Sequence, residues 1–371
     1  MKLIVLRSNL KEGLSAVERA VSDNNNLPIL RNVLIKTYNN KIKIAATNLE
    51  LGITKFTSGK IIEEGGITVP FSTLYSIVNN TDSERINLET KNNTLIFKTD
   101  NYEAKIQGVT EEDFPIIPKI ENEDYNMEIE APIFKDSVSK VIHAAQISEI
   151  RPEISGVLID FQMTMIKLVA TDAFRLAYKT INTNQFKHNF NHGFKVIVPL
   201  KTISEVVRIF GDNQPIKIYM DNTQILFKNE ELELISRIID GDYPDYEQII
   251  PKGIDTEIIL NKDYLINALK LVSNFAGRTN DIKLKVDDGS KVVEIYSVSQ
   301  SLGENKYLIP AKIKGEKVGE ISFNWRYLMD GLKAVDSENL LFGINGNVKP
   351  ANIKSPEDES YSYILMPIKS V

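Results

Sequence analysis

The chain has 371 residues, a hydrophobic content of 42%, a charged content of 25% and a formal net charge of −6. This length exceeds one typical core, so two or three domains of ordinary globular composition are expected. The absence of cysteine excludes disulfides and thiolate metal sites and fits a cytoplasmic protein. No apolar run approaches the roughly 18 residues that a membrane span needs, and the acidic balance argues mildly against nucleic-acid binding.

The first third begins with a short strand and an amphipathic helix in "LIVLRSNLKEGLSAVERAV" from Leu3. Its apolar positions recur at i, i+4, i+7 and i+11, which defines one face of a helix. They are Leu10, Leu14, Val17 and Val21. A second helix is expected in "VPFSTLYSIV" from Val69, with Pro70 in its first turn. Alternating segments such as "ERINLETKNNTLIFKTDNYEAKI" predict antiparallel strands and hairpins.

The same frame returns twice, in "MEIEAPIFKDSVSKVIHAA" from Met127 and in "EIILNKDYLINALKLVSNF" from Glu257. The predicted helix positions keep their spacing. They are Phe134, Val138, Val141 and Ala145, then Tyr264, Ala268, Leu271 and Phe275. Second helices follow in "VPLKTISEVV", with Pro199 in its first turn, and in "FNWRYLMDGL", where Asn324 is the expected N-cap.

The segments that close the first two thirds also repeat. They read "DFPIIPK" (113–119) and "DYPDYEQIIPK" (242–252), and the second has four extra residues, 245–248. We therefore predict an α+β fold of three tandem repeats, each with two helices on antiparallel sheets. The predicted domains are residues 1–122, 123–252 and 253–371.

Charge is unevenly divided between the predicted helices and the rest of the chain. The helices span 9–21, 70–79, 132–145, 199–210, 261–278 and 324–335, and they carry eleven basic and six acidic residues. A difference of this size also arises by chance. The alternative interpretation is a helical surface that faces a polyanion, with an acidic exterior that resists nonspecific association.

The segment "VATDAFRLAYK" (169–179) follows a strand-like run, as "AATNLELGITK" (45–55) does 124 residues earlier. The two frames match, but Asp-Ala-Phe-Arg-Leu has no apparent counterpart in the first copy. This difference predicts a site that only the second domain has.

Six segments carry a resemblance to a known family. They are "LPILRNVLI" (27–35), "ATDAFRLA" (170–177), "VIVPLK" (196–201), "GDYPDYEQIIP" (241–251), "FNWRYL" (323–328) and "YILMPI" (363–368). In this order, on a threefold repeat, they resemble the bacterial DNA polymerase III beta subunit, the replication sliding clamp, along the whole chain. The resemblance implies a clamp fold and a head-to-tail homodimer. This ring would surround duplex DNA without regard to sequence, as a non-catalytic processivity factor without cofactor or metal. Closing a ring would also remove the unpaired strand edge at each end of a three-domain arc.

The resemblance further implies a groove in which peptides of the replicative polymerase and the clamp loader bind through a glutamine and apolar or aromatic anchors. Its expected residues are Ile154, Thr171, Phe174, Arg175, Leu176, Pro244, Ile249, Tyr327, Pro350, Ala351, Ile364, Met366, Pro367 and Ile368. For Ile154 and Leu176, an ordinary core position is an equal alternative. Ala173-Phe174 stands where the family commonly has a Gly-His pair.

The resemblance also implies residues for the other two surfaces. The DNA-facing residues are expected to be Lys140, Lys201, Arg208 and Arg278, and the dimer interface is expected to contain Ala104, Ile106, Leu271 and Val272. Asn24 and Ser72 stand where two basic DNA contacts are usual, so contact of the first domain with DNA is expected to be weak.

Two other function classes fit the sequence less well. The first alternative is a non-ring scaffold that binds peptides through the same groove. The second is an enzyme: His188 and His192 have a metal-ligand spacing, but "KHNFNH" is loop-like and lacks the Glu of the zinc-protease motif. Asp172 beside Arg175 is expected to order its loop rather than to act as an acid or base.

Overall fold

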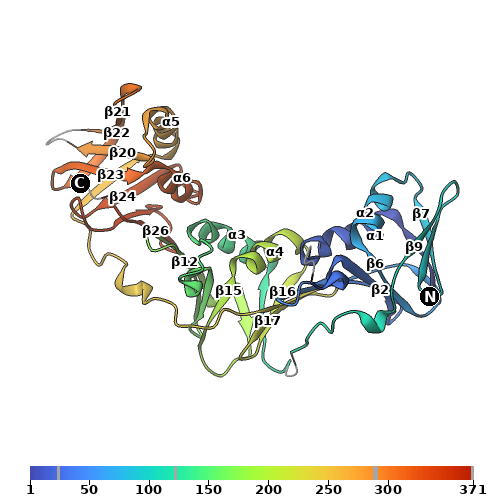
Figure 1. Cartoon of the computed structure of the whole chain (residues 1–371). Coiled ribbons are helices and arrows are strands. Elements are labelled where there is room, and N and C mark those ends of the chain that lie inside the picture. The colour runs from blue at the N-terminus through green and yellow to red at the C-terminus, as the bar shows by residue number, and fades with distance from the viewer. Residues whose placement is uncertain (23–25, 121–122, 287–290, 369–371) are drawn as a thin grey trace. The chain divides into compact units, whose positions relative to one another are not determined.

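A computed structural model describes residues 1–22, 26–120, 123–286 and 291–368 (Figure 1). Its contacts group the chain into two compact units. The first unit comprises 1–131, 187–190 and 205–238, and the second comprises 132–186, 191–204 and 239–371. The central third of the chain contributes to both units, so the domain limits expected near 122 and 252 stay a prediction.

In the described residues, six α-helices form where the periodicity predicts them, two in each third of the chain. They are α1 (Arg7–Val17), α2 (Phe71–Asn80), α3 (Ala131–Val141), α4 (Leu200–Ile209), α5 (Lys262–Val272) and α6 (Trp325–Lys333). The first helix of each third continues into a 3-10 turn. These turns are η1 (Glu18–Ala20), η4 (Ile142–Ala144) and η8 (Ser273–Phe275).

The helix starts agree with the predicted caps to within one residue. Asn324 is the N-cap of α6, and its Oδ1 accepts a hydrogen bond from the backbone N–H of Arg326 at 3.0 Å. Pro70 and Pro199 lie one residue before α2 and α4 rather than inside the first turn.

The strands repeat in the same order in each third. The first third contains β1 (Lys2–Leu6), β2 (Asn32–Tyr38), β3 (Lys41–Thr47), β4 (Leu51–Thr57), β5 (Lys60–Glu63), β6 (Gly66–Pro70), β7 (Arg85–Lys91), β8 (Thr94–Lys98) and β9 (Glu103–Gln107). The second contains β10 (Met127–Glu130), β11 (Gly156–Phe161), β12 (Met165–Thr171), β13 (Arg175–Asn182), β14 (Phe186–His188), β15 (Phe194–Pro199), β16 (Pro215–Met220), β17 (Gln224–Lys228) and β18 (Leu232–Arg237).

The last third contains one strand fewer, because β22 is long and spans two positions of the repeat. Its strands are β19 (Thr256–Asn261), β20 (Asp281–Val286), β21 (Val292–Ser299), β22 (Gly303–Gly315), β23 (Val318–Asn324), β24 (Asn339–Ile344), β25 (Ala351–Lys354) and β26 (Tyr361–Leu365). Shorter 3-10 turns are η2 (Pro28–Arg31), η3 (Glu111–Asp113), η5 (Pro152–Ile154), η6 (Thr183–Gln185) and η7 (Tyr246–Gln248).

Two strand pairs join consecutive thirds into continuous antiparallel sheets. In the first unit, β18 pairs with β4 in a nine-stranded sheet of order β14-β10-β16-β17-β18-β4-β3-β2-β6, and a five-stranded sheet has the order β5-β1-β7-β8-β9. In the second unit, β26 pairs with β13 in a twelve-stranded sheet of order β15-β11-β12-β13-β26-β25-β24-β19-β22-β21-β20-β23. We call these two strand pairs the first junction and the second junction.

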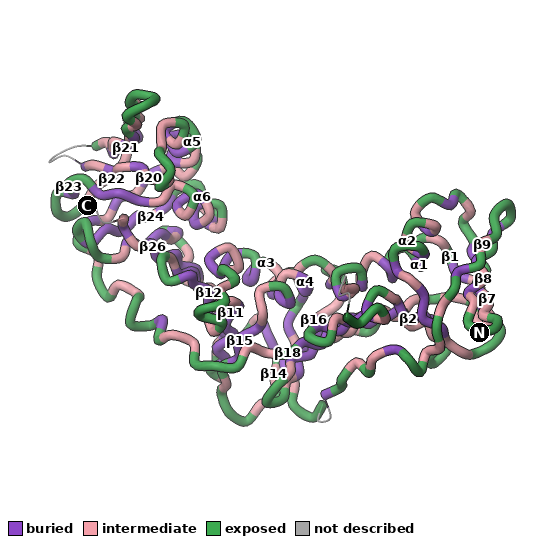
Figure 2. Tube along the Cα trace, viewed as in Figure 1, coloured by how far each residue is buried: buried purple, intermediate pink, exposed green. Residues whose placement is uncertain are grey.

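Each junction is covered on both faces. In the second unit, β26 is buried at all five positions (Figure 2). Tyr363 faces α6, where a Cβ at Gly331 would lie 2.3 Å from the tyrosine ring, so only glycine permits this approach. Adjacent Ile364 points to the opposite face and packs in a cluster with Tyr246 from the segment that closes the second third.

The segment that closes the first third covers the first junction in the same way. Ile44 on β3 faces α1, as shown by its closeness to Gly13. The neighbouring Ala45 therefore points to the other face, where it packs with Phe114 of the closing segment. The core of each unit thus lies between its helices and its sheet, with a second apolar layer under the closing segment.

The apolar faces predicted for the first and third helices are confirmed within α1 and α3. Of the four positions predicted for the fifth helix, only Ala268 is buried and Phe275 is half-buried. The buried residues of α5 are Leu265, Ala268, Leu269 and Val272. Tyr264 and Leu271 are 53% and 54% exposed. The buried set follows i, i+3, i+4 and i+7, which is also a helical stripe, so the sequence of α5 carries two apolar faces.

Candidate functional site

The turn between β12 and β13 is held by its own side chains. The Thr171 hydroxyl donates to the carbonyl of Arg175 at 2.6 Å and accepts from the N–H of Ala173 at 3.1 Å. Oδ1 of Asp172 accepts from the N–H groups of Phe174 and Arg175, both at 3.0 Å. Ala173 has φ 74°, so the turn contains a left-handed residue that this network stabilises. The result is a fixed loop that leaves the Phe174 side chain 62% exposed.

The first junction contains the same turn, 124 residues earlier. The Thr47 hydroxyl donates to the Leu51 carbonyl at 2.9 Å, and Oδ1 of Asn48 accepts from the N–H groups of Glu50 and Leu51 at 3.0 and 2.8 Å. Leu49 has φ 77°. The expectation that the second copy has no counterpart is therefore wrong, because the backbone motif is shared.

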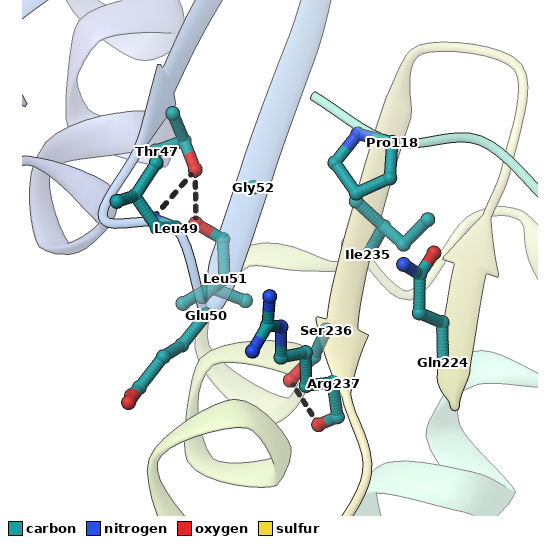
Figure 3. Close-up of a pocket in the computed structure, with 10 residues that line it drawn as sticks. All are labelled: Thr47, Leu49, Glu50, Leu51, Gly52, Pro118, Gln224, Ile235, Ser236 and Arg237. Atoms are coloured by element: carbon teal, nitrogen blue, oxygen red, sulfur yellow. Dashed lines mark hydrogen bonds between the residues drawn. The ribbon is translucent and has the colours of Figure 1, made fainter. Parts of the chain in front are cut away.

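The side chains at corresponding positions distinguish the two junctions. Glu50 corresponds to Phe174, and Gly52 corresponds to Leu176. At Gly52 a Cβ would lie 2.8 Å from the Ile117 side chain, so glycine lets the closing segment approach the sheet. Figure 3 shows the small pocket of the first junction, where Pro118 of this segment lies beside β18.

The Arg175 guanidinium is neutralised inside the second unit. Its Nε lies 2.9 Å from Oδ2 of Asp172, and its Nη1 lies 2.6 Å from Oδ2 of Asp330. The central guanidinium carbon, Cζ, lies 4.2 Å from the centre of the Tyr327 ring. Burial alone disfavours the charged guanidinium, but Tyr363 and the two carboxylates outweigh it and raise the pKa of Arg175. The predicted role of Asp172 in ordering the loop agrees with this geometry, and Arg175 fixes the position of Tyr327.

His143 lies against the same network. Its ring centre is 5.5 Å from that of Tyr363. Burial lowers the pKa of His143 to about 4, and the positive charge of Arg175 contributes while Asp330 opposes the shift. The imidazole is therefore neutral at pH 7 and acts as an aromatic packing group.

The four extra residues of the second closing segment contain its anchor. Tyr246 is 2% exposed and packs with Leu176 and Ile364. Its hydroxyl donates to Oδ2 of Asp160 at 2.8 Å, and Asp160 itself is 2% exposed. Neither residue is among those predicted from the sequence, although the insertion at 245–248 is a signal for Tyr246. The anchor fixes the residues on either side of it, which include Pro244 and Ile249.

The predicted groove residues divide into a buried layer and an accessible layer. Those that are buried are Ile154, Thr171, Leu176, Ala351, Ile364 and Pro367. Those that are half-buried or exposed are Phe174, Arg175, Pro244, Ile249, Tyr327, Pro350, Met366 and Ile368. Leu176 is a core residue, in agreement with the alternative considered for it.

Backbone contacts bring several of the accessible residues together. The N–H of Met366 donates to the carbonyl of Phe174 at 2.9 Å, and the N–H of Ile368 donates to the carbonyl of Ser322 at 2.8 Å. Strand pairing places Leu365 opposite both Arg175 and Ala351. The C-terminal segment therefore borders the turn, and Ile154 is the buried last residue of η5.

Two of the four residues predicted to face DNA are engaged within the protein. Lys140 is 8% exposed and pairs with Asp136 at 3.0 Å and with Asp336, so its charge is balanced within the protein. Arg208 pairs with Glu205 at 2.7 Å and donates to two carbonyls at the end of α1. Arg208 is nevertheless exposed, as are Lys201 and Arg278.

The predicted dimer residues also divide by burial. Val272 is 1% exposed and Ile106 is 5% exposed, so neither presents its side chain to a partner, and their prediction as contacts is corrected. Ala104 is half-buried on β9, at the edge of its sheet. Leu271 is exposed, and its carbonyl accepts a hydrogen bond from Asn305 of β22 at 3.0 Å.

Some predicted features have no place in this site. Asn24 lies outside the described residues, and Ser72 is exposed on α2. Within the ranges that the structure describes, no group of three or more His, Asp or Glu residues is placed to hold a metal ion. Across those ranges, no helix is both long and apolar enough to cross a membrane.

Comparison with known proteins gives matches along the chain. Three models of the DNA polymerase III beta subunit match it: the N-terminal domain at residues 1–118, the central domain at 128–245 and the C-terminal domain at 247–369. The beta sliding clamp of Bacillus subtilis is 28% identical over 100% of both chains. That of Synechococcus elongatus is 27% identical over 100% of this chain and 99% of its own. The crystal structure of the DNA polymerase sliding clamp from Bacillus subtilis has a TM-score of 0.94 at 27% identity, with 100% of each chain covered.

Proposed function

We infer that this chain, which belongs to the DNA polymerase III beta subunit family, is a DNA sliding clamp and a processivity factor of replication. The inference rests on all three family domains, matched in order. It also rests on the threefold repeat of strands and helices. The fold is the three-domain clamp fold.

Ring closure as a head-to-tail homodimer is the assembly that the repeat supports best. In each junction, the last strand of one repeat pairs with the fourth strand of the preceding repeat. The first junction pairs β18 with β4, and the second pairs β26 with β13. One strand of each kind is left over: β9, at the end of its sheet, and residues 303–309 of β22. Within the described residues, that part of β22 pairs only with β21. Two copies of the chain would pair these edges twice, which closes a ring.

The exposed side chains beside these edges support the same assembly. Tyr264 and Leu271 form the second apolar face of α5, and Leu308 on β22 is 51% exposed. An exposed apolar patch beside an unpaired strand edge is a feature of a protein interface. We therefore place Tyr264, Leu271 and Leu308 in the dimer contact, with β9 of the partner opposite.

The proposed contact with DNA is weak and independent of sequence. Lys201, Arg208 and Arg278 are the exposed cations of the predicted set, and they would contact phosphates. A ring retains DNA by topology, so it needs little affinity, and tight binding would oppose sliding. The net charge of −6 is compatible with this role.

The accessible layer of the second unit is the proposed docking site for peptides of the replicative polymerase and the clamp loader. Phe174 and Met366, with Tyr327 nearby, would supply apolar contacts, and Pro244 and Ile249 would border the site from the anchored closing segment. Apolar pockets with a few fixed polar groups are typical of such sites. We propose no catalytic role and a cytoplasmic location. A peptide-binding scaffold that forms no ring is the alternative.

The decisive observation is the pair of left-over strands, and two measurements test it. Analytical ultracentrifugation should show a dimer. After loading onto circular DNA, the protein should resist removal by high salt, whereas protein on linear DNA should dissociate as salt screens the phosphate contacts. Equal loss from circles and from linear DNA would contradict a ring, and a monomer that still binds the peptide would favour the scaffold.

A further inference from the structure

The first unit contains a larger hollow beside the pocket of Figure 3. It lies between the closing segment and the face of the nine-stranded sheet opposite α1, and its cavity volume is about 270 Å³. Gly52, Pro118 and Ile235 border both spaces. Binding sites for small ligands typically have volumes of about 300–1,000 Å³, so the hollow is close to the lower end of this range and suits only a small ligand.

One wall of the hollow is apolar and aromatic. Phe56 on β4 lies with its ring centre 5.8 Å from that of Tyr38, and both line the space. Leu226 on β17 belongs to the same wall, and Ile117 and Ile120 line the hollow from the closing segment. Such a surface would accept a flat ring or another apolar group.

The same wall contains a lysine whose charge is not balanced. This lysine, Lys43, is the direct cross-strand partner of Phe56. Lys43 on β3 is half-buried, and its cross-strand neighbour on β2 is Lys36. Like charges directly opposite each other are destabilising, and Lys36 already pairs with Glu111 at 3.0 Å. Among the described residues, no carboxylate lies within ion-pair distance of Lys43, and Lys119 of the closing segment also lines the hollow.

The nearby carboxylates form ion pairs with another lysine, Lys228. Lys228 lies 3.4 Å from Glu123 and 3.3 Å from Glu233, and all three line the hollow. Burial lowers the pKa of Lys43. The charge of Glu233 acts in the opposite direction, while Lys119 and Lys36 lower the pKa further. An anion beside Lys43 would relieve both its desolvation and its repulsion by neighbouring lysines.

We propose that this hollow is a binding site for a small aromatic anion, whose carboxylate or sulfonate group pairs with Lys43 and Lys119 while its ring packs against Phe56. An occupant would contact both the sheet and the closing segment, so binding would stabilise the first junction. The site is separate from the peptide site and from the left-over strand edges, and its test involves neither DNA nor dimerisation.

The probe is 8-anilinonaphthalene-1-sulfonate, titrated into the full chain and followed by its fluorescence. Lys43→Gln keeps most of the side-chain length and removes the charge, and it should weaken binding about tenfold, as loss of a hydrogen bond to a charged group does. Lys60→Gln on β5 is the matched control, since Lys60 is an exposed lysine of the same unit outside the hollow. It should bind the probe like the wild type. Phe56→Leu should also weaken binding.

Thermal unfolding and crystallography complete the test. Lys43→Gln should not lower the melting temperature, because the change removes a repulsion, and the probe should raise the melting temperature of the wild type more than that of the variant. A crystal soaked with the probe should show its sulfonate at Lys43 and its ring against Phe56. Equal affinity in wild type, Lys43→Gln and Lys60→Gln, or a probe bound only elsewhere, would overturn the proposal.

Discussion

Replacing Tyr246 with alanine should release the closing segment of the second third and weaken peptide binding. The side chain is 2% exposed, and truncation of a buried aromatic residue costs about 3–5 kcal/mol. Tyr246→Phe keeps the ring and loses only the hydrogen bond to Asp160. The Asp160 carboxylate still contacts Gln162 at 3.1 Å and Lys195 at 3.6 Å in this variant. We therefore expect the free energy of unfolding to fall by an amount near the lower end of about 1.5–3 kcal/mol.

The effect on peptide affinity follows from how much of the segment stays docked. A site that is assembled only part of the time binds with an affinity reduced by that fraction. We expect Tyr246→Phe to bind close to wild type and Tyr246→Ala to bind about tenfold or more weakly, because Pro244 and Ile249 then lack a fixed position. Titration of a fluorescent peptide with a glutamine and apolar anchors measures the affinities. Hydrogen exchange of residues 241–252 measures how much of the closing segment stays packed against the sheet.

Phe97→Ala is the matched control for general destabilisation. Phe97 is 0% exposed on β8 in the five-stranded sheet of the first unit. Its truncation should lower the melting temperature while leaving peptide affinity unchanged. If Tyr246→Ala exchanges rapidly at 241–252 and still binds the peptide like the wild type, the closing segment is not part of the site and the reasoning fails.

Four further changes test the other surfaces. Leu271→Asp should yield a monomer by ultracentrifugation, since it places a charge on the exposed face of α5; a stable dimer would remove α5 from the interface. Lys201→Ala should reduce the salt slope for linear DNA by about one unit, as loss of one phosphate contact does; an unchanged slope would mean that Lys201 does not contact phosphate. Met366→Ala should weaken the peptide roughly thirtyfold, equivalent to about 2 kcal/mol, with dimerisation intact; unchanged affinity would place the site elsewhere. Because the folded pKa of His143 is lowered to about 4, the unfolded chain binds the proton more tightly, so stability should fall as pH drops from about 6.5 towards 4. His143→Phe should flatten that dependence in a pH series of thermal melts, and an equally steep series would refute the assignment.

Local patterns in the sequence determined much of this protein. The threefold frame and the six helices follow from apolar periodicity, because a helix that covers a sheet must carry an apolar stripe wherever its repeat occurs. The Asn324 cap follows from a side chain that bonds to its own neighbouring backbone. The importance of the turn after β12 was indicated by comparing the repeats, and that of the C-terminal segment came from the family resemblance, which short motifs carry even at low identity.

Tertiary structure decided which of these features are available for function. The two faces of α5 are both apolar, and only packing against the sheet determines that Leu271 is left exposed. Arg175 pairs with Asp330, which is 155 residues away in the sequence, and Lys140 pairs with Asp336, which is 196 residues away. No local pattern announces such pairs, because the free energy of a charge depends on what folding places beside it. The shared turn of the two junctions was also hidden, since its hydrogen bonds need only a threonine followed by Asn or Asp and tolerate different residues around them.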